Sequence, residues 1–205
     1  MKQLIIIGSG ISGLACSYYL RKKFKIKIFE QNDYLGGHTH THLLESEKIH
    51  YDSGFIVFND KNYPNFIKMI NALRVKYQTS NMSFSVTNDK INYEWAGKNL
   101  RTIFDIKNIF TIRYFKILRD IIRFSKLCEN SALIHDYSLK KFLYKNNFSK
   151  EFINLYLLPM CSSIWSSDLK DIKNYNTSFI LNFFKNHGLN NILTKRPTWY
   201  TIKNG

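Results

Sequence analysis

The sequence contains no long apolar run and little cysteine. No stretch of 18 apolar residues occurs, so no segment is expected to span a membrane. The N-terminal apolar run, Leu4–Ile7, breaks at Gly8 after four residues, which argues against a signal peptide. The three cysteines are far apart and form no Cys-x-x-Cys pair, as is typical of reduced thiols. We therefore expect a soluble, cytoplasmic protein.

Acidic residues are also scarce. The chain has 15 Asp and Glu against 30 Lys and Arg, a formal net charge of +15. The basic residues are scattered and form no block of five or six like charges. Because no zinc-finger or RNP signature is present, we expect no nucleic-acid partner. We interpret most of the charge as compositional. The open alternative is a peripheral contact with an anionic membrane or another polyanion.

The strongest pattern present lies in the first thirty residues. An apolar run, Leu4–Ile7, is followed directly by the glycine turn Gly8–Gly13, a helix-like segment Leu14–Lys23 and a second strand, Lys25–Phe29. Glu30 stands at the tip of that strand, near the spacing at which an acid meets a ribose hydroxyl. This order predicts a dinucleotide-binding βαβ unit.

Each residue of the turn has a physical role in such a unit. Gly8 permits a tight turn, Gly10 lets the backbone approach a pyrophosphate, and Gly13 lets the helix pack on the sheet. The amides of Ile11 and Ser12 are expected at the helix N-terminus, where the dipole favours phosphate charge. The turn therefore predicts binding of an adenosine diphosphate group.

A second glycine pair, Gly36 and Gly37, follows the acid closely and precedes His38. It permits another close backbone approach on the diphosphate side. Nicotinamide-only folds do not need this pair, so it favours FAD. Residues 48–58 are predicted to form a hairpin arm that ends in a buried strand. Gly54 in this segment either lets a flat group come close to the backbone or is an ordinary strand glycine.

Three histidines, His38, His40 and His42, alternate along a stretch that would place them on one face of a strand. Three imidazoles could hold a metal. The alternative is a polar strand or loop beside the cofactor, with His38 donating to a phosphate. No carboxylate or cysteine completes a recognisable site, so we expect no metal.

Residues 1–60 are predicted to form the N-terminal part of an FAD-binding domain, and residues 61–205 a mostly helical substrate domain with a small sheet. The elements predicted in the second region are a helix from Pro64, strands over 82–86 and 90–95, and helices over 106–127, from about Ser138 to Tyr144, over 150–158 ended by Pro159, and over 179–185 capped at 176–178 and ended by His187–Gly188.

Several segments of the chain together carry a family resemblance: Gly8–Ala15 with Glu30, Leu35–Thr41, Asp52–Asn59, Asn62–Asn65, Met82–Val86, Leu157–Met160, Ile164–Ser166 and Phe183–Leu189. On these segments the chain resembles the bacterial NAD/FAD-binding oxidoreductases of the flavin amine oxidase superfamily. More distantly, it is similar to phytoene desaturases and protoporphyrinogen oxidases.

The resemblance implies an α/β fold: an FAD/NAD(P)-binding Rossmann-like fold of the glutathione-reductase type with an inserted, mostly helical substrate domain. It also implies hydride transfer from an apolar substrate, such as a lipid, to flavin N5, with oxygen or another acceptor reoxidising the flavin. Carried over by position, the implied contacts are Ile11 and Ser12 to the pyrophosphate, Glu30 to the ribose, Gly37 and His38 to the diphosphate, and Gly54 and Phe55 to the flavin ring. His38 departs from the arginine common in the superfamily.

Members of the family are longer, and their C-terminal part carries a Gly-Asp signature that this sequence lacks. We therefore expect the N-terminal half of a flavoenzyme, with the C-terminal part missing. Two functions follow: an FAD-dependent oxidoreductase resembling amine oxidases and desaturases, or a catalytically silent dinucleotide-binding half that needs a C-terminal partner polypeptide. No catalytic residue is assigned, because such chemistry relies mainly on the cofactor. Trp165 is a substrate-pocket candidate, although a core position is favoured.

Overall fold

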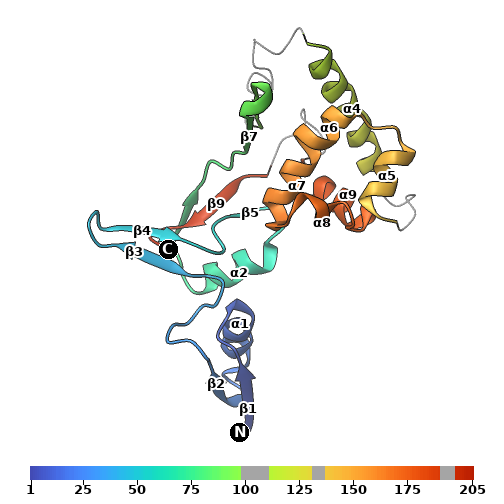
Figure 1. The fold of residues 1–205 in the computed structure, drawn as a ribbon. Coiled ribbons are helices and arrows are strands. Elements are labelled where there is room, and N and C mark those ends of the chain that lie inside the picture. The colour runs from blue at the N-terminus through green and yellow to red at the C-terminus, as the bar shows by residue number, and fades with distance from the viewer. Residues whose placement is uncertain (98–110, 131–136, 190–196) are drawn as a thin grey trace. The chain divides into compact units, whose positions relative to one another are not determined.

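A computed structural model describes residues 1–97, 111–130, 137–189 and 197–205 (Figure 1). The chain divides into two compact units. Unit 1 comprises Met1–Asn81 and Thr198–Gly205, and unit 2 comprises Met82–Pro197. This division by compactness is not a test of the predicted functional boundary at residue 60, which stays a prediction.

Unit 1 begins with the predicted strand, glycine turn, helix and strand. Its elements, in chain order, are β1 (Lys2–Ile7), α1 (Ile11–Leu20), β2 (Phe24–Phe29), β3 (Thr41–Leu44), β4 (Ile49–Asp52), β5 (Phe58–Asn59), α2 (Pro64–Ala72), β6 (Tyr77–Thr79) and β9 (Trp199–Ile202). Strands β1 and β2 are parallel and in register from Lys2↔Phe24 to Ile7↔Phe29. Helix α1 starts at Ile11, three residues before the predicted start. The last residues of the glycine segment, Ile11 to Gly13, therefore belong to the first turn of the helix.

The alternating residues of β1 and β2 give this small sheet two unlike faces. The even-numbered residues from Leu4 to Ile28 are half-buried, and the odd-numbered ones are exposed. Ile5 is 61% exposed, Ile7 89% and Phe29 48%. One face of the β1–β2 sheet therefore presents large apolar side chains to solvent.

The rest of unit 1 is a hairpin and a three-stranded sheet. Strands β3 and β4 pair antiparallel, and β9 lies between β5 and β6, antiparallel to both. The hairpin arm and buried strand predicted over 48–58 are present as two separate strands: β4, which ends at Asp52, and the buried β5, which begins at Phe58. Helix α2 begins at Pro64 as predicted, with proline in the first turn, where its missing N–H costs nothing.

Unit 2 contains a hairpin and several helices. Its described elements are β7 (Ser85–Asn88), η1 (Asp89–Ile91), β8 (Tyr93–Ala96), α4 (Ile112–Glu129), α5 (Leu139–Lys145), α6 (Lys150–Phe152), η3 (Ile153–Leu157), α7 (Leu158–Trp165), α8 (Leu169–Ile172) and α9 (Thr177–Asn186). The predicted β7–β8 hairpin is confirmed, and its strands are joined by η1. The predicted helix start at 106–110 lies outside the described residues.

Side-chain caps set several helix starts in unit 2. The Ser138 hydroxyl accepts from the Lys141 amide, and the Asn176 side chain accepts from the Phe179 amide, which confirms both predicted starts. Gly188 follows α9 with φ +63°, as a C-terminal glycine should. Apolar side chains from α4 to α9 and from β8 then form one continuous core.

The prediction that Pro159 ends a helix is wrong. The chain stays helical through η3, a π-helical segment in which the Leu158 amide donates to the Ile153 carbonyl, and Pro159 lies in the first turn of α7. Proline cannot donate to the carbonyl of Leu155, four residues earlier. The buried Trp95 indole Nε1–H donates to that carbonyl instead, at 2.8 Å. A contact from a distant strand therefore satisfies the backbone where proline would otherwise interrupt it.

The buried carboxylate Asp120 ties α4 to the turn before α6. Its Oδ2 accepts from the Ser149 amide at 2.7 Å, and its Oδ1 accepts from Arg123 at 2.9 Å and from Arg119 at 3.1 Å. Burial by itself would raise the pKa of Asp120, but these hydrogen bonds outweigh it and hold that pKa below the ordinary value. Asp120 is therefore an ionised cap buried beneath two arginines.

Candidate functional site

Two glycines of the N-terminal turn are required by the protein itself, Gly8 by its backbone conformation and Gly13 by packing. Gly8 has φ +91°, a conformation that disfavours side chains, and its amide donates to the Phe29 carbonyl at 2.7 Å. A Cβ on Gly13 would lie 2.2 Å from the Gly8 carbonyl oxygen and 3.2 Å from Ile6. The helix-packing reason expected for Gly13 is thus present in the structure.

Gly10 is different, because no residue that the structure describes requires a glycine there. Its backbone is extended, with φ −65° and ψ 172°, and a Cβ would meet no atom within 4 Å. The space beside Gly10 is open. Because a side chain would occupy the same space as a ligand drawn close to the backbone, the residue present fits a bound dinucleotide.

The N-terminus of α1 opens at the same place. Gly10 is its N-cap and no side chain caps it, so the amides of Ile11 and Ser12 begin a helix without a local acceptor from a side chain. The first turn carries no acidic residue that would oppose an anion. This end of α1 is therefore chemically suited to phosphate.

The second glycine pair packs directly on the first turn. The Gly36 amide donates to the Ser9 carbonyl at 2.9 Å, and Gly10 and Gly36 form a parallel bridge. A Cβ on Gly37 would lie 3.0 Å from the Cα of Gly10. Both Gly36 and Gly37 have positive φ, +107° and +59°. The structure thus brings together two motifs separated by more than twenty residues.

The third motif, Gly54 and Phe55, contacts the second motif at the backbone of His38. A Cβ on Gly54 would lie 1.9 Å from the His38 carbonyl oxygen, and the Phe55 amide donates to the same oxygen at 2.9 Å. Gly54 is therefore explained by a protein contact. The Phe55 ring packs near Tyr63 and Phe66. Contact of Gly54 and Phe55 with a flavin stays a prediction.

Glu30 is held at the tip of β2 by donors from the protein. Its Oε2 accepts from the Ser9 amide at 2.7 Å and the Ser9 hydroxyl at 2.6 Å. Its Oε1 accepts from the amides of Gln31 and Asn32 and from the Asn32 side chain, at 2.8, 3.0 and 3.2 Å. The backbone bond from Asn32, followed by the bonds from Ser9, lowers the pKa of Glu30 from 4.5 to about 2.

Five donors already fill the roughly four lone-pair positions of the Glu30 carboxylate. A ribose hydroxyl would therefore have to replace one of them, and the Asn32 side-chain contact is the longest. The predicted ribose role stays a prediction. Ser9, which is fully buried and holds Glu30, was missed by the sequence reasoning; its only signal was a small polar residue between two glycines.

Two of the three alternating histidines, His40 and His42, lie in an aromatic stack. His40 lies between Tyr34 and His42, with ring centroids 4.1 and 4.0 Å away, and Tyr51 continues the stack beyond His42. His42 Nε2 is 2.8 Å from the Ser53 hydroxyl. Within the described ranges, no group of three or more His, Cys, Asp or Glu side chains could hold a metal ion.

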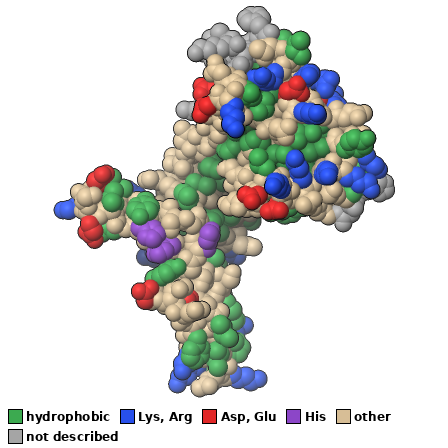
Figure 2. All heavy atoms as spheres, viewed as in Figure 1, with side chains coloured by type: hydrophobic (Ala, Val, Ile, Leu, Met, Phe, Trp, Pro, Cys, Tyr) green, Lys and Arg blue, Asp and Glu red, His purple; other side chains and the backbone are tan. Residues whose placement is uncertain are grey.

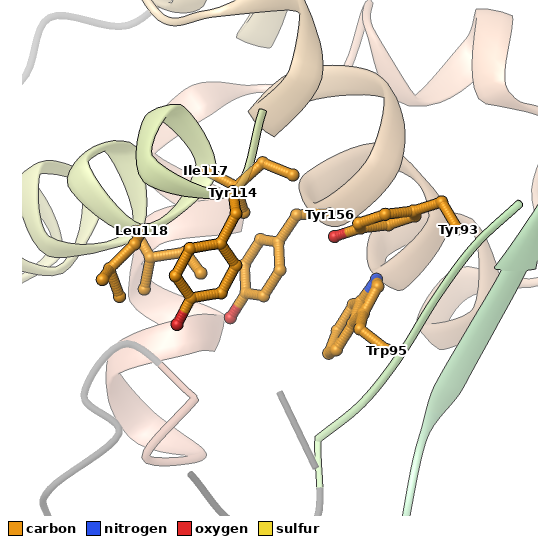
Figure 3. A pocket seen from close by; sticks show the side chains of 7 residues that line it. Tyr93, Trp95, Tyr114, Ile117, Leu118 and Tyr156 are labelled. Atoms are coloured by element: carbon orange, nitrogen blue, oxygen red, sulfur yellow. The ribbon is translucent and has the colours of Figure 1, made fainter. Parts of the chain in front are cut away.

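Unit 2 shows no comparable site among its described residues. Trp165 packs beside the core against Tyr175, Phe179 and Phe183, which agrees with the favoured core position. A small pocket has a free volume of about 10 Å³, room for one water molecule. It is lined by Tyr93, Trp95, Tyr114, Ile117, Leu118, Ile121 and Tyr156 (Figure 3).

Comparisons with known proteins agree with this geometry. Residues 6–73 match the family described as an NAD(P)-binding Rossmann-like domain. The chain is 31% identical over 168 residues to a 1-hydroxycarotenoid 3,4-desaturase of Flavobacterium sp. (strain P99-3), an alignment that covers 77% of this chain and 33% of that protein. The chain thus spans about a third of the length of that curated relative.

Solved structures share the fold at low identity. Cyclohexylamine oxidase from Brevibacterium oxydans IH-35A is 16% identical with a TM-score of 0.67, over 98% of this chain and 46% of that one. A putative protoporphyrinogen oxidase from Exiguobacterium sp. 255-15 is 16% identical with a TM-score of 0.65, over 100% of this chain and 48% of that one. Putrescine oxidase is 15% identical with a TM-score of 0.63, over 97% and 46%.

These similarities confirm the predicted Rossmann-like α/β fold. Residues 6–73 are thus similar to an NAD(P)-binding Rossmann-like domain, and the fold of the described residues is shared with solved amine oxidases.

Proposed function

We propose that the chain is the FAD-binding part of an oxidoreductase that removes hydride from an apolar small molecule, a class that includes lipids. The observation that carries the proposal is the open space at Gly10, where two glycine motifs meet the uncapped N-terminus of α1. The name of the curated relative, a carotenoid desaturase, supports an apolar substrate.

In this proposal, the chain's own residues bind and orient the cofactor. The amides of Ile11 and Ser12 hold the pyrophosphate, and Gly36, Gly37 and His38 border the diphosphate. Glu30 keeps the turn in shape through Ser9 and takes the ribose hydroxyl in exchange for Asn32. Bound FAD supplies the hydride acceptor of the reaction.

The proposed functional division assigns residues 1–60 to the cofactor and residues 61–205 to the substrate side. Gly54 and Phe55, at the end of the first region, are the proposed neighbours of the flavin ring. We also infer a reducing, cytoplasmic location, which the three free cysteines support. Among the described residues no helix is long and apolar enough to cross a bilayer.

The test is retention of FAD by the whole chain. The protein is expressed, saturated with FAD and passed through gel filtration, and the flavin absorbance that elutes with it is measured. Gly10→Val should abolish retention without unfolding the chain, because the Gly10 backbone accepts a side chain and the new methyl groups enter open space. Gly97→Ala is the matched control, since its Cβ makes ordinary contacts at 3.5 Å in unit 2. Equal FAD retention by both variants would contradict the site.

One observation favours a second candidate function, a dinucleotide-binding half that is silent until a partner polypeptide joins it. The outer face of the β1–β2 sheet exposes Ile5, Ile7 and Phe29, and such faces are normally covered in α/β folds. Here the chain alone should elute without flavin. Co-expression with a polypeptide corresponding to the rest of a superfamily member should restore the flavin absorbance that elutes with the protein.

A further inference from the structure

Helix α4 is apolar on two opposite faces. Its inner face packs into the core of unit 2 through Ile117, Ile121, Phe124 and Cys128, each at most 4% exposed. A helix at a protein surface needs only one such face, and its opposite side is ordinarily polar. The outer face of α4 does not follow that rule.

Three large apolar residues stand on this outer face. Ile112 is 75% exposed, Phe115 59% and Ile122 50%. Their spacing of three and seven residues places them in one line along the helix. Single exposed apolar residues are common, but an aligned set on one helix marks an interaction surface.

Cations lie within and beside this line. The side chain of Arg119 is 57% exposed between Phe115 and Ile122, and Lys126 follows one turn later. Lys116 and Arg123 flank the line, with side chains 44% and 38% exposed. The long stems of these side chains can lie along an apolar surface while their charged ends reach outward.

The anions near this face are few. Asp120 is fully buried beneath Arg119 and Arg123, and Glu151 pairs with Lys116 at 2.8 Å. The helix itself carries five basic residues and two acidic ones, Asp120 and Glu129. Figure 2 shows basic side chains spread among hydrophobic ones over the surface of unit 2.

We propose that the outer face of α4, formed by Ile112, Phe115, Arg119, Ile122 and Lys126, docks on an anionic lipid bilayer. The apolar side chains enter the boundary between headgroups and acyl chains, and the cations contact lipid phosphates. The excess of positive charge selects an anionic bilayer over a neutral one. The helix lies along the surface, and the proposal does not depend on FAD binding.

The test is co-sedimentation of the whole chain with vesicles. Vesicles of phosphatidylcholine alone are compared with vesicles that also contain phosphatidylglycerol, at low and high salt. We expect binding to the anionic vesicles only, weakened by salt. The double variant Phe115→Ser/Ile122→Ser should lower the partition coefficient by about tenfold or more, because two inserted side chains are lost.

The matched control is Leu43→Ser/Leu44→Ser, which removes two exposed apolar side chains, 44% and 42% exposed, from strand β3. It should bind vesicles like the parent chain, and circular dichroism should be the same for all three proteins. Equal binding by the two double variants, equal binding to neutral vesicles, or no binding at low salt would overturn the proposal. So would a Phe115- and Ile122-dependent dimer in light scattering without vesicle binding.

Discussion

The two units of the chain are stabilised in different ways. Among the described residues, the buried apolar side chains of unit 1 are Phe58, Met69 and Ile70, whereas unit 2 buries one continuous aromatic and aliphatic cluster. Unit 1 relies on backbone contacts between glycine turns, and its β1–β2 sheet is half-exposed. The difference indicates that unit 2 can be stable by itself, while unit 1 gains stability from whatever binds it.

The largest change in unfolding free energy is expected from a substitution in the core of unit 2. The Phe124 ring packs against Phe142, Phe148, Phe152 and Phe184, with ring centroids 5.3–6.4 Å away. Phe124→Ala should lower the free energy of unfolding by about 3–5 kcal/mol, because it leaves a cavity among these rings. Urea unfolding followed by tryptophan fluorescence measures it, since two of the three tryptophans, Trp95 and Trp165, lie in unit 2.

Phe115→Ala on the same helix is the control for this prediction. Its side chain is 59% exposed, so the free energy of unfolding should change by less than about 0.5 kcal/mol. If the two alanine variants lost equal stability, the division of α4 into a core face and an outer face would be wrong.

A smaller loss of unfolding free energy is expected from changing the contact that accommodates Pro159 within the helical segment of unit 2. Trp95→Phe removes the indole donor from the buried Leu155 carbonyl and should cost about 1–2 kcal/mol of unfolding free energy. Pro159→Ala supplies a backbone N–H near that carbonyl. In a double-mutant cycle, the cost of Trp95→Phe should therefore fall by about 1 kcal/mol in the Pro159→Ala background. Strict additivity would show that the two groups do not share this carbonyl.

The smallest effect concerns unit 1 and is best seen as a titration. Because the pKa of Glu30 is lowered from 4.5 to about 2, its contribution to stability is fully present above pH 4.5 and is lost as the pH falls towards 2. The amide resonance of Ser9, which donates to Glu30, should titrate with a midpoint near 2. Glu30→Gln should remove this titration, and a midpoint near 4.5 in the parent chain would contradict the hydrogen bonding described.

The sequence predicted the elements whose signals are local. The β1–α1–β2 unit followed from glycine spacing and hydrophobic periodicity, and the helix starts at Ser138 and Asn176 followed from capping residues. The end of the helix at Pro159 was predicted wrongly, because the donor that replaces its N–H comes from Trp95, some sixty residues away. No local pattern records such a contact.

For the candidate site, the sequence predicted which residues are involved but not the contacts between distant turns. The glycines of all three motifs were found from sequence by their spacing, and Gly8, Gly36 and Gly37 also have a local conformational reason to be glycine, because their φ angles are positive. The contact of Gly54 with His38 and the five donors around Glu30 depend on how distant turns meet. Gly54 had two open interpretations, and the reason for a glycine there is the His38 carbonyl oxygen, which lies 1.9 Å from the point that a Cβ would occupy.

The pairing of β9 has a consequence for the order in which the chain can fold. This strand, Trp199–Ile202, lies between β5 and β6, whose residues precede it by more than one hundred positions. The three-stranded sheet cannot form on the ribosome until β9 has emerged, whereas the contacts of unit 2 lie within Met82–Pro197 and can form earlier. Synthesis of unit 1 therefore begins before that of unit 2 and is completed after it.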